Sequence, residues 1–141
     1  MEKNLLYFLL GNIDMARITT KKLIELSSDV DFKKLLLADL DSYEKFYDRC
    51  AALKTDGEAL KDVSFVAENM TKLTIGAKTL RDKSPAKMSH MLMEGFEMGI
   101  TDARENIKKA RQEQEREEVI LLATEYLALL CDNQEQYRKF L

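Results

Sequence analysis

Residues that interrupt regular secondary structure are scarce in this chain, which has one proline and five glycines among 141 residues. Folds built from many short strands need turns rich in glycine and proline, so such folds are disfavoured. Helix-forming residues dominate instead. Because 45% of the residues are hydrophobic and 33% are charged, the chain can form both a core and a solvated surface. The sequence therefore predicts an all-α fold, and its length is that of a single domain, residues 1–141.

Apolar residues recur every three or four positions in five segments, which is the spacing of amphipathic helices. We expect four of these segments to form an antiparallel four-helix bundle, at residues 4–26, 30–54, 85–111 and 116–140. We expect the fifth, at residues 60–81, to be a crossover helix between the second and third core helices.

Three breaks between these segments contain residues that are typical of helix ends or turns. Residues 27–29 are two serines and an aspartate, which are typical capping residues. Asp56-Gly57 is a strong turn signal. Ser84 and Pro85 suit the N-cap and the first position of a helix, so this dipeptide predicts a helix start.

The segment after Pro85 contains no glycine or proline beyond Gly99. A single helix from residue 85 to residue 140 would be about 84 Å long, which is longer than a compact domain of this size can use. Residues 111–118 have no apolar side chain, and the stripe that resumes at Val119 is rotated by about 140° from the earlier one. One straight helix would bury two nearly opposite faces, so we expect the chain to reverse within residues 111–118.

Positive and negative side chains are mixed along the chain, and the net charge is −3. No basic stripe is long enough to follow a phosphate backbone, so we expect no nucleic-acid partner. The N-terminal apolar run, residues 5–10, is much shorter than the roughly 20 residues of a membrane span, and it lacks the pattern of a secretory signal. We therefore expect a cytoplasmic protein with no membrane partner.

The two cysteines, Cys50 and Cys131, fall at apolar positions of two different predicted helices. We interpret both as reduced, buried thiols of a cytoplasmic protein. The alternative is a disulfide between neighbouring helices, which requires the two Cα atoms to lie within about 7 Å.

Metal ligands are sparse on the predicted inner faces. A di-iron bundle takes a glutamate from each of two helices and Glu-x-x-His from each of the other two, whereas this chain has one histidine and no such motif. Asp39 and Asp102 lie near inner stripes and are the candidate internal carboxylates. His90, Glu94 and Glu97 share one helix face, which we interpret as solvated; the alternative is a surface metal site. We predict no cofactor.

Four polar side chains are expected on the inner helix stripes, namely Thr20, Tyr43, Tyr126 and Asn133. Buried hydroxyl and amide groups need partners, so we expect these groups to bond to one another or to a trapped water. If they instead line a cavity, that cavity is the best candidate for a small-ligand site. On the third core helix, Gly95 and Gly99 lie four residues apart among methionines, which predicts the close approach of a neighbouring helix.

The order of the predicted elements resembles that of the ferritin-like superfamily: a helical hairpin, a crossover of about thirty residues and a second hairpin. Residues 51–57, which end the first hairpin, and residues 83–85, which open the second, carry this likeness. Residues 91–100 also look like the third core helix of small bacterial ferritin-like proteins. In relatives that bind metal, the resemblance implies a glutamate on the first helix and Glu-x-x-His on the second. The matching regions here, residues 16–23 and 39–47, contain neither, so we expect a ferritin-like bundle that has not retained the di-iron motifs.

Residue patterns typical of catalysis by a nucleophile and a base, or of a phosphate-binding loop, are absent from the sequence. We expect a non-enzymatic protein that acts through protein–protein contacts as a homodimer. The apolar surface of residues 5–10 (Leu5 to Leu10) and 119–131 (Val119 to Cys131) is expected to form the dimer interface. The alternatives are a degenerate ferritin-like metal-binding protein or oxidase, and a protein that binds a small ligand inside the bundle.

Overall fold

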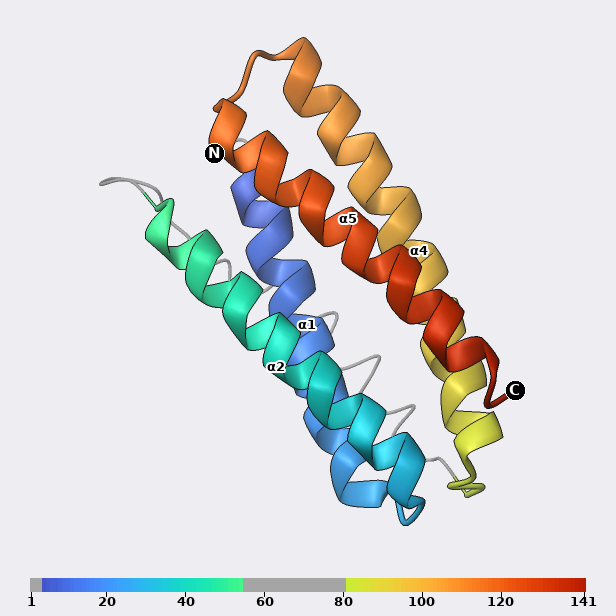
Figure 1. Cartoon of the computed structure of the whole chain (residues 1–141). Coiled ribbons are helices and arrows are strands. Elements are labelled where there is room, and N and C mark those ends of the chain that lie inside the picture. Colours follow the sequence, from blue (N-terminus) through green and yellow to red (C-terminus); the bar gives the residue numbers. More distant parts are fainter. Residues whose placement is uncertain (1–3, 55–80) are drawn as a thin grey trace.

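The computed structural model describes residues 4–54 and 81–141. This part of the chain forms four helices, α1 (Leu5–Leu26), α2 (Val30–Ala52), α4 (Pro85–Gln112) and α5 (Glu117–Arg138) (Figure 1). The predicted all-α class is confirmed for these residues, and the helix bounds differ from the expected ones by at most two residues. The expected crossover helix at residues 60–81 lies outside the described residues, apart from residue 81.

Side-chain caps begin three of the four helices. The Asn4 side chain accepts a hydrogen bond from the Tyr7 amide at 2.8 Å, and Asp29 accepts one from the Phe32 amide at 2.8 Å. Ser84 accepts one from the Lys87 amide at 3.2 Å and is followed by Pro85 at the start of the helix. Each cap satisfies an amide that has no partner within its helix. The helix start predicted at Ser84-Pro85 is therefore confirmed.

The helices form two helical hairpins (Figure 1). Residues 27–29 connect α1 to α2, and residues 113–116 connect α4 to α5. Within each hairpin the two helices pack side by side, and further contacts join α1 to α4 and α5, and α2 to α5. Four helices therefore surround a shared interior.

The reversal predicted within residues 111–118 is confirmed, and a C-cap of Schellman type produces it. Gln114 adopts a left-handed backbone conformation with a φ of 55°. The Glu115 amide donates to the Ala110 carbonyl at 2.9 Å, and the Gln114 amide donates to the Arg111 carbonyl at 3.2 Å. The Glu115 carboxylate then accepts a hydrogen bond from the Leu5 amide at 3.1 Å. The turn between α4 and α5 thus also holds the start of α1.

Aromatic and aliphatic side chains from all four helices fill the core. The ring of Tyr137 on α5 contacts Phe32 of α2 at a centroid distance of 5.7 Å and Phe96 of α4 at 5.6 Å. Burial of large apolar side chains of this kind is the main favourable term in folding. The core therefore ties the second helix of one hairpin to both helices of the other.

The apolar run at residues 5–10 belongs to this core. Its four leucines are buried within the single chain: Leu5, Leu6, Leu9 and Leu10. These leucines therefore supply no exposed apolar surface, and the homodimer expected through this run stays a prediction. Along residues 119–131 most large apolar side chains are buried as well, and Leu121, at 60% exposed, is the main exception. The sequence of α5 is apolar on several faces, and other parts of the same chain cover most of its large apolar side chains.

The two glycines of α4 differ in their surroundings. A Cβ added at Gly99 would lie 3.3 Å from the Leu130 side chain of α5 and 3.8 Å from Asn12 of α1, so the close helix approach predicted here is confirmed. A Cβ added at Gly95 would meet no atom of the described residues within 4 Å. Gly95 therefore leaves space beside the helix where close packing was expected.

In the described part of the chain, none of the helices has a stretch that is both long and apolar enough to cross a membrane.

Candidate ligand pocket

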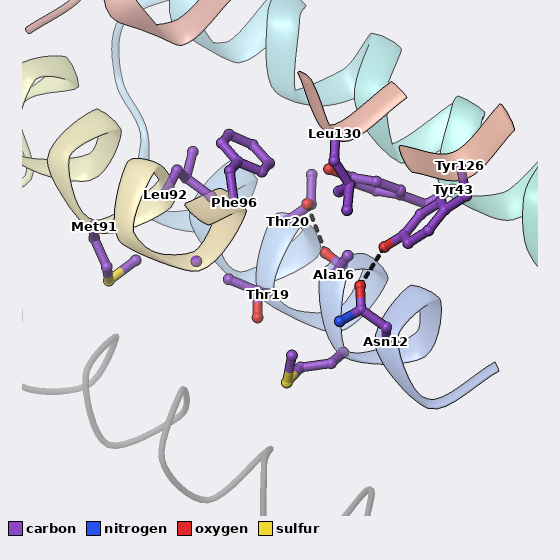
Figure 2. Close-up of a pocket in the computed structure, with 12 residues that line it drawn as sticks. Asn12, Ala16, Thr19, Thr20, Tyr43, Met91, Leu92, Phe96, Tyr126 and Leu130 are labelled. Carbon is purple, nitrogen blue, oxygen red and sulfur yellow. Dashed lines mark hydrogen bonds between the residues drawn. The ribbon is translucent and has the colours of Figure 1, made fainter. Parts of the chain in front are cut away.

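A half-open pocket of about 70 Å³ lies at the meeting point of the four helices (Figure 2). All four helices contribute side chains to its wall. The described residues that line it are Asn12, Met15, Ala16, Thr19, Thr20, Tyr43, Met91, Leu92, Gly95, Phe96, Tyr126 and Leu130. The missing side chain of Gly95 is one physical reason for the space. Most of this wall is apolar, which is typical of small-molecule sites.

Two hydrogen bonds between helices lie beside this pocket. The Tyr126 hydroxyl donates to Asn12 Oδ1 at 2.5 Å, which joins α5 to α1 (Figure 2). The Asn133 side-chain amide donates to the Tyr43 hydroxyl at 2.9 Å, which joins α5 to α2. The expectation that Tyr43, Tyr126 and Asn133 are buried and hydrogen-bonded is met by these contacts. Asn12 was not expected on an inner face, because it sits in a polar Gly-Asn pair directly after the apolar run.

Thr20 is buried but does not join these bonds. Its hydroxyl donates to the Ala16 carbonyl of its own helix at 2.7 Å. Back-bonding of this kind satisfies a threonine hydroxyl within a helix without a tertiary partner. Of the four polar residues predicted on inner stripes, Tyr43 and Asn133 therefore bond to each other, Tyr126 bonds to Asn12, and Thr20 bonds within its own helix.

Two polar groups at the pocket keep hydrogen-bonding capacity that these contacts do not use. The Tyr43 oxygen accepts the bond from Asn133, so its own proton is available, and the described residues offer it no acceptor. Asn12 uses its oxygen for Tyr126, so its amide N–H groups are also available, and Figure 2 shows this nitrogen turned away from that bond. Both unused groups are donors. Two residues of this mainly apolar wall therefore keep hydrogen-bond donors that no described residue uses.

A buried carboxyl group lies next to this cluster but does not line the pocket. Asp39 is 5% exposed, and Tyr137 is its hydrogen-bond partner. Desolvation raises the pKa of Asp39 from 3.8 to about 6, while the hydrogen bond from Tyr137 lowers it. One oxygen of Asp39, Oδ2, is buried and has no hydrogen-bond partner among residues 4–54 and 81–141. Burial also raises the pKa of the Tyr43 and Tyr137 hydroxyls, and the Asp39 charge adds to this effect.

The other candidate metal ligands lie apart from the interior. Asp102, His90, Glu94 and Glu97 are exposed on α4. The position expected for Asp102 beside an inner face is therefore wrong, whereas His90, Glu94 and Glu97 lie on the solvated face that we inferred. His90 Nε2 lies 3.7 Å from Glu94 Oε1. Within residues 4–54 and 81–141, no three side chains of histidine, cysteine, aspartate or glutamate are grouped to hold a metal ion.

Both cysteines are free thiols, so the alternative of a disulfide between them is wrong. Cys50 is fully buried, and desolvation raises the pKa of its thiol to about 12. A thiol with this pKa is not a nucleophile at neutral pH. Cys131 is only half-buried, so the expectation of burial is correct for Cys50 alone.

Neither a family model, nor a curated protein, nor a solved structure matches this chain.

Proposed function

We propose that this protein is a non-enzymatic binding protein that takes a small, neutral, mainly apolar molecule into the pocket between the four described helices. The observation that carries this proposal is an apolar pocket of about 70 Å³ with unused donors on Tyr43 and Asn12. Buried donors gain free energy when a ligand supplies an acceptor, because an unmade buried bond is costly. A ligand with a carbonyl or ether oxygen fits this pattern.

The residue types in the pocket wall also favour an uncharged ligand and argue against catalysis. Among the described residues that line the pocket, there is no lysine, arginine, histidine, aspartate, glutamate or cysteine. A charged ligand would lose its hydration there without gaining a counter-charge. The same set offers no general base within reach of a nucleophile. The wall therefore favours reversible binding.

Nuclear magnetic resonance of methionine methyl groups tests this proposal with cyclopentanone as the probe. Met15 and Met91 line the pocket, whereas Met98 is exposed elsewhere on α4. We expect the Met15 and Met91 methyl signals to shift saturably, with a Kd in roughly the millimolar range for six heavy atoms. Cyclopentanecarboxylate should leave them unchanged, because its charge has no partner in the pocket. If neither methyl shifts up to the solubility limit of the ketone, the proposal fails.

A pocket-filling variant gives the matched control. Gly95→Leu places a side chain where a Cβ has no neighbour within 4 Å in the described part of the chain. We expect this variant to fold and to lose the response of Met15 and Met91 to cyclopentanone. Met98→Leu changes an exposed position of the same helix and should retain the response. Equal responses from both variants would place the probe outside this pocket.

A second candidate function is the homodimer expected from the sequence, through which the chain would act by protein–protein contact. The exposure of Leu121 on α5 favours it, since the leucines of residues 5–10 are buried. Sedimentation velocity at micromolar concentration tests it, and a monomer throughout would contradict it.

We also retain the ferritin-like arrangement, with its antiparallel bundle and crossover, as a proposal about the fold. Two helical hairpins separated by residues 53–84 support it. The alternative that follows is a degenerate metal-binding protein or oxidase. Elemental analysis of the purified protein tests this alternative, and stoichiometric iron or manganese would favour it over ligand binding. A cytoplasmic location is likewise proposed, and the two free thiols support it.

A further inference from the structure

A second surface feature, separate from the pocket, is a groove between α4 and α5. Ile107 of α4 and Leu127 of α5 supply its apolar part, and Thr124 lies beside them. Arg104, Lys108 and Arg111 of α4 line its edge. Ile107 is buried and Leu127 is half-buried, so the groove has an apolar floor and a basic rim.

The three cations of this rim lack carboxylate partners. Arg104, Lys108 and Arg111 are spaced by four and three residues, so they follow one face of α4. In the described part of the chain, none of them has a carboxylate oxygen within 4.0 Å, although exposed cations elsewhere, such as Lys45 and Arg49, are paired. The whole chain carries a net charge of −3. The groove is therefore a locally positive surface on an acidic protein.

The first half of α5 carries the opposite pattern on its outer face. Glu117 and Glu118 are exposed, and neither has an ion-pair partner among the described residues. Leu121 follows within one helical turn and is 60% exposed. The unpaired carboxylates of this face therefore complement the unpaired cations of the groove, and Leu121 adds an exposed apolar side chain beside the carboxylates.

We propose that a second copy of this chain places the first half of its α5 in the groove between α4 and α5, so that two chains form a symmetric dimer. In a two-fold arrangement with antiparallel α5 helices, Leu121 packs against Leu121 of the second copy. Glu117 of the second copy then lies level with residue 125 of the first copy, and Glu118 of the second copy lies level with Thr124 of the first. Thr124 lines the groove with Arg104 and Lys108, so the carboxylates meet the cations at this level.

This inference rests on the homodimer given as the second candidate function, and it adds the surface, the register and the charges that hold it. Sedimentation velocity on the full chain over a range of concentrations tests both. We expect Leu121→Ser to weaken self-association at least tenfold, because it removes the central apolar contact. Leu37→Ser is the matched control, since Leu37 is 49% exposed on α2, and it should leave association unchanged.

Charge reversal tests the register. Arg104→Glu with Lys108→Glu should abolish association, and adding Glu117→Lys with Glu118→Lys in the same chain should restore it. The control pair Lys33→Glu with Lys34→Glu makes the same change in net charge on α2 and should have no effect. Circular dichroism melting verifies that each variant is folded. Raising the salt concentration should weaken the native dimer, because exposed ion pairs are screened.

The outcomes separate the two claims. A dimer that is insensitive to Leu121→Ser and to the groove reversal would overturn this interface and leave the homodimer standing. A monomer at every concentration would overturn both. Association that weakens with Leu121→Ser but is not restored by the paired charge reversals would overturn the proposed register.

Discussion

Asp39 is the residue whose position in the structure has the clearest energetic consequence. This residue is 5% exposed, and its Oδ2 atom has no hydrogen-bond partner within the described part of the chain. The groups that interact with it, Tyr43 and Tyr137, are uncharged at neutral pH, since the ordinary pKa of a tyrosine hydroxyl is about 10 and burial raises the pKa of both further. Among residues 4–54 and 81–141, no cation offsets the cost of burying the ionised carboxylate, so its charge is unfavourable in the folded state.

The stability of the protein should therefore depend on the ionisation of Asp39. Its pKa is 3.8 in the unfolded chain and about 6 in the folded state. Between these values the folded state holds a proton that the unfolded chain has released, so the free energy of unfolding should fall as pH rises from about 4 to about 6. A difference of about two pKa units corresponds to roughly 3 kcal/mol.

Asp39→Asn removes this ionisation and keeps an oxygen that can accept the Tyr137 bond. We expect the variant to be more stable than the native protein by about 2–3 kcal/mol at pH 7, and to differ little at pH 4. Urea unfolding of both proteins from pH 4 to pH 8 measures the difference, and the comparison cancels the titration of other carboxylates. Parallel stability curves would contradict the prediction.

Gln114 holds the turn between α4 and α5 in a backbone conformation that favours glycine. A non-glycine residue with a φ of 55° is disfavoured by roughly 1 kcal/mol. We expect Gln114→Gly to stabilise the protein by about 0.5–1 kcal/mol in chemical denaturation. Gln112→Gly is the control, since this residue is the last of α4, where glycine should be destabilising. A destabilised Gln114→Gly variant would show that the Gln114 side chain contributes more than the backbone strain.

At the scale of single helices, α4 shows that two glycines four residues apart need not serve the same purpose. Gly99 meets Leu130 and Asn12 where three helices converge, whereas Gly95 borders the open pocket. Their spacing places both on nearly one face of α4, but Gly99 is buried whereas Gly95 is exposed. Neighbouring helices therefore pack closely against α4 at Gly99, whereas the pocket lies beside it at Gly95.

This difference gives a paired prediction for α4. Gly95→Ala should stabilise the protein by about 0.5–1 kcal/mol, because alanine restricts the unfolded chain and its Cβ meets none of the described residues within 4 Å. Gly99→Ala should give a smaller gain or a loss, because the Leu130 side chain lies 3.3 Å from the added Cβ and must move. Thermal unfolding of both variants measures the order. A larger gain at Gly99 would contradict this account of α4.

At the scale of the whole molecule, a few buried polar bonds specify how the two hairpins dock. Tyr126 and Asn12 are 114 residues apart in the chain, and Asn133 and Tyr43 are 90 apart. Hydrophobic packing alone tolerates small rotations of a helix, whereas a buried hydrogen bond fixes the rotation at which its partners meet. These two bonds therefore set the faces that α1, α2 and α5 present to one another, and with them the shape of the pocket.

Removing one hydroxyl tests this contribution. Tyr126→Phe keeps the ring and leaves Asn12 Oδ1 without its donor, so we expect a loss of about 1–3 kcal/mol in the free energy of unfolding. Tyr47→Phe, at a half-buried position of α2, should change stability by less than about 0.5 kcal/mol. Urea unfolding measures both. A cost near zero at Tyr126 would mean that a water replaces the hydroxyl.

The sequence by itself determined the features that depend on neighbouring residues. The spacing of apolar residues predicts the four described helices, the Ser84-Pro85 pair predicts the start of α4, and the phase change at residues 111–118 predicts the turn. It did not reveal that Gln114 would form this turn, because glutamine has no preference for a positive φ. Helix periodicity and capping act over a few residues, so a single chain segment contains their whole signal.

Only the tertiary structure decided what each helix face meets. It placed the leucines of residues 5–10 in the core, turned Asp102 outward and brought Asn12 to Tyr126. It also placed Gly95 beside a pocket, although the sequence predicted a helix contact there. The physical reason is that each helix has several apolar faces, and the packing of hairpins from distant parts of the chain decides which of them is covered.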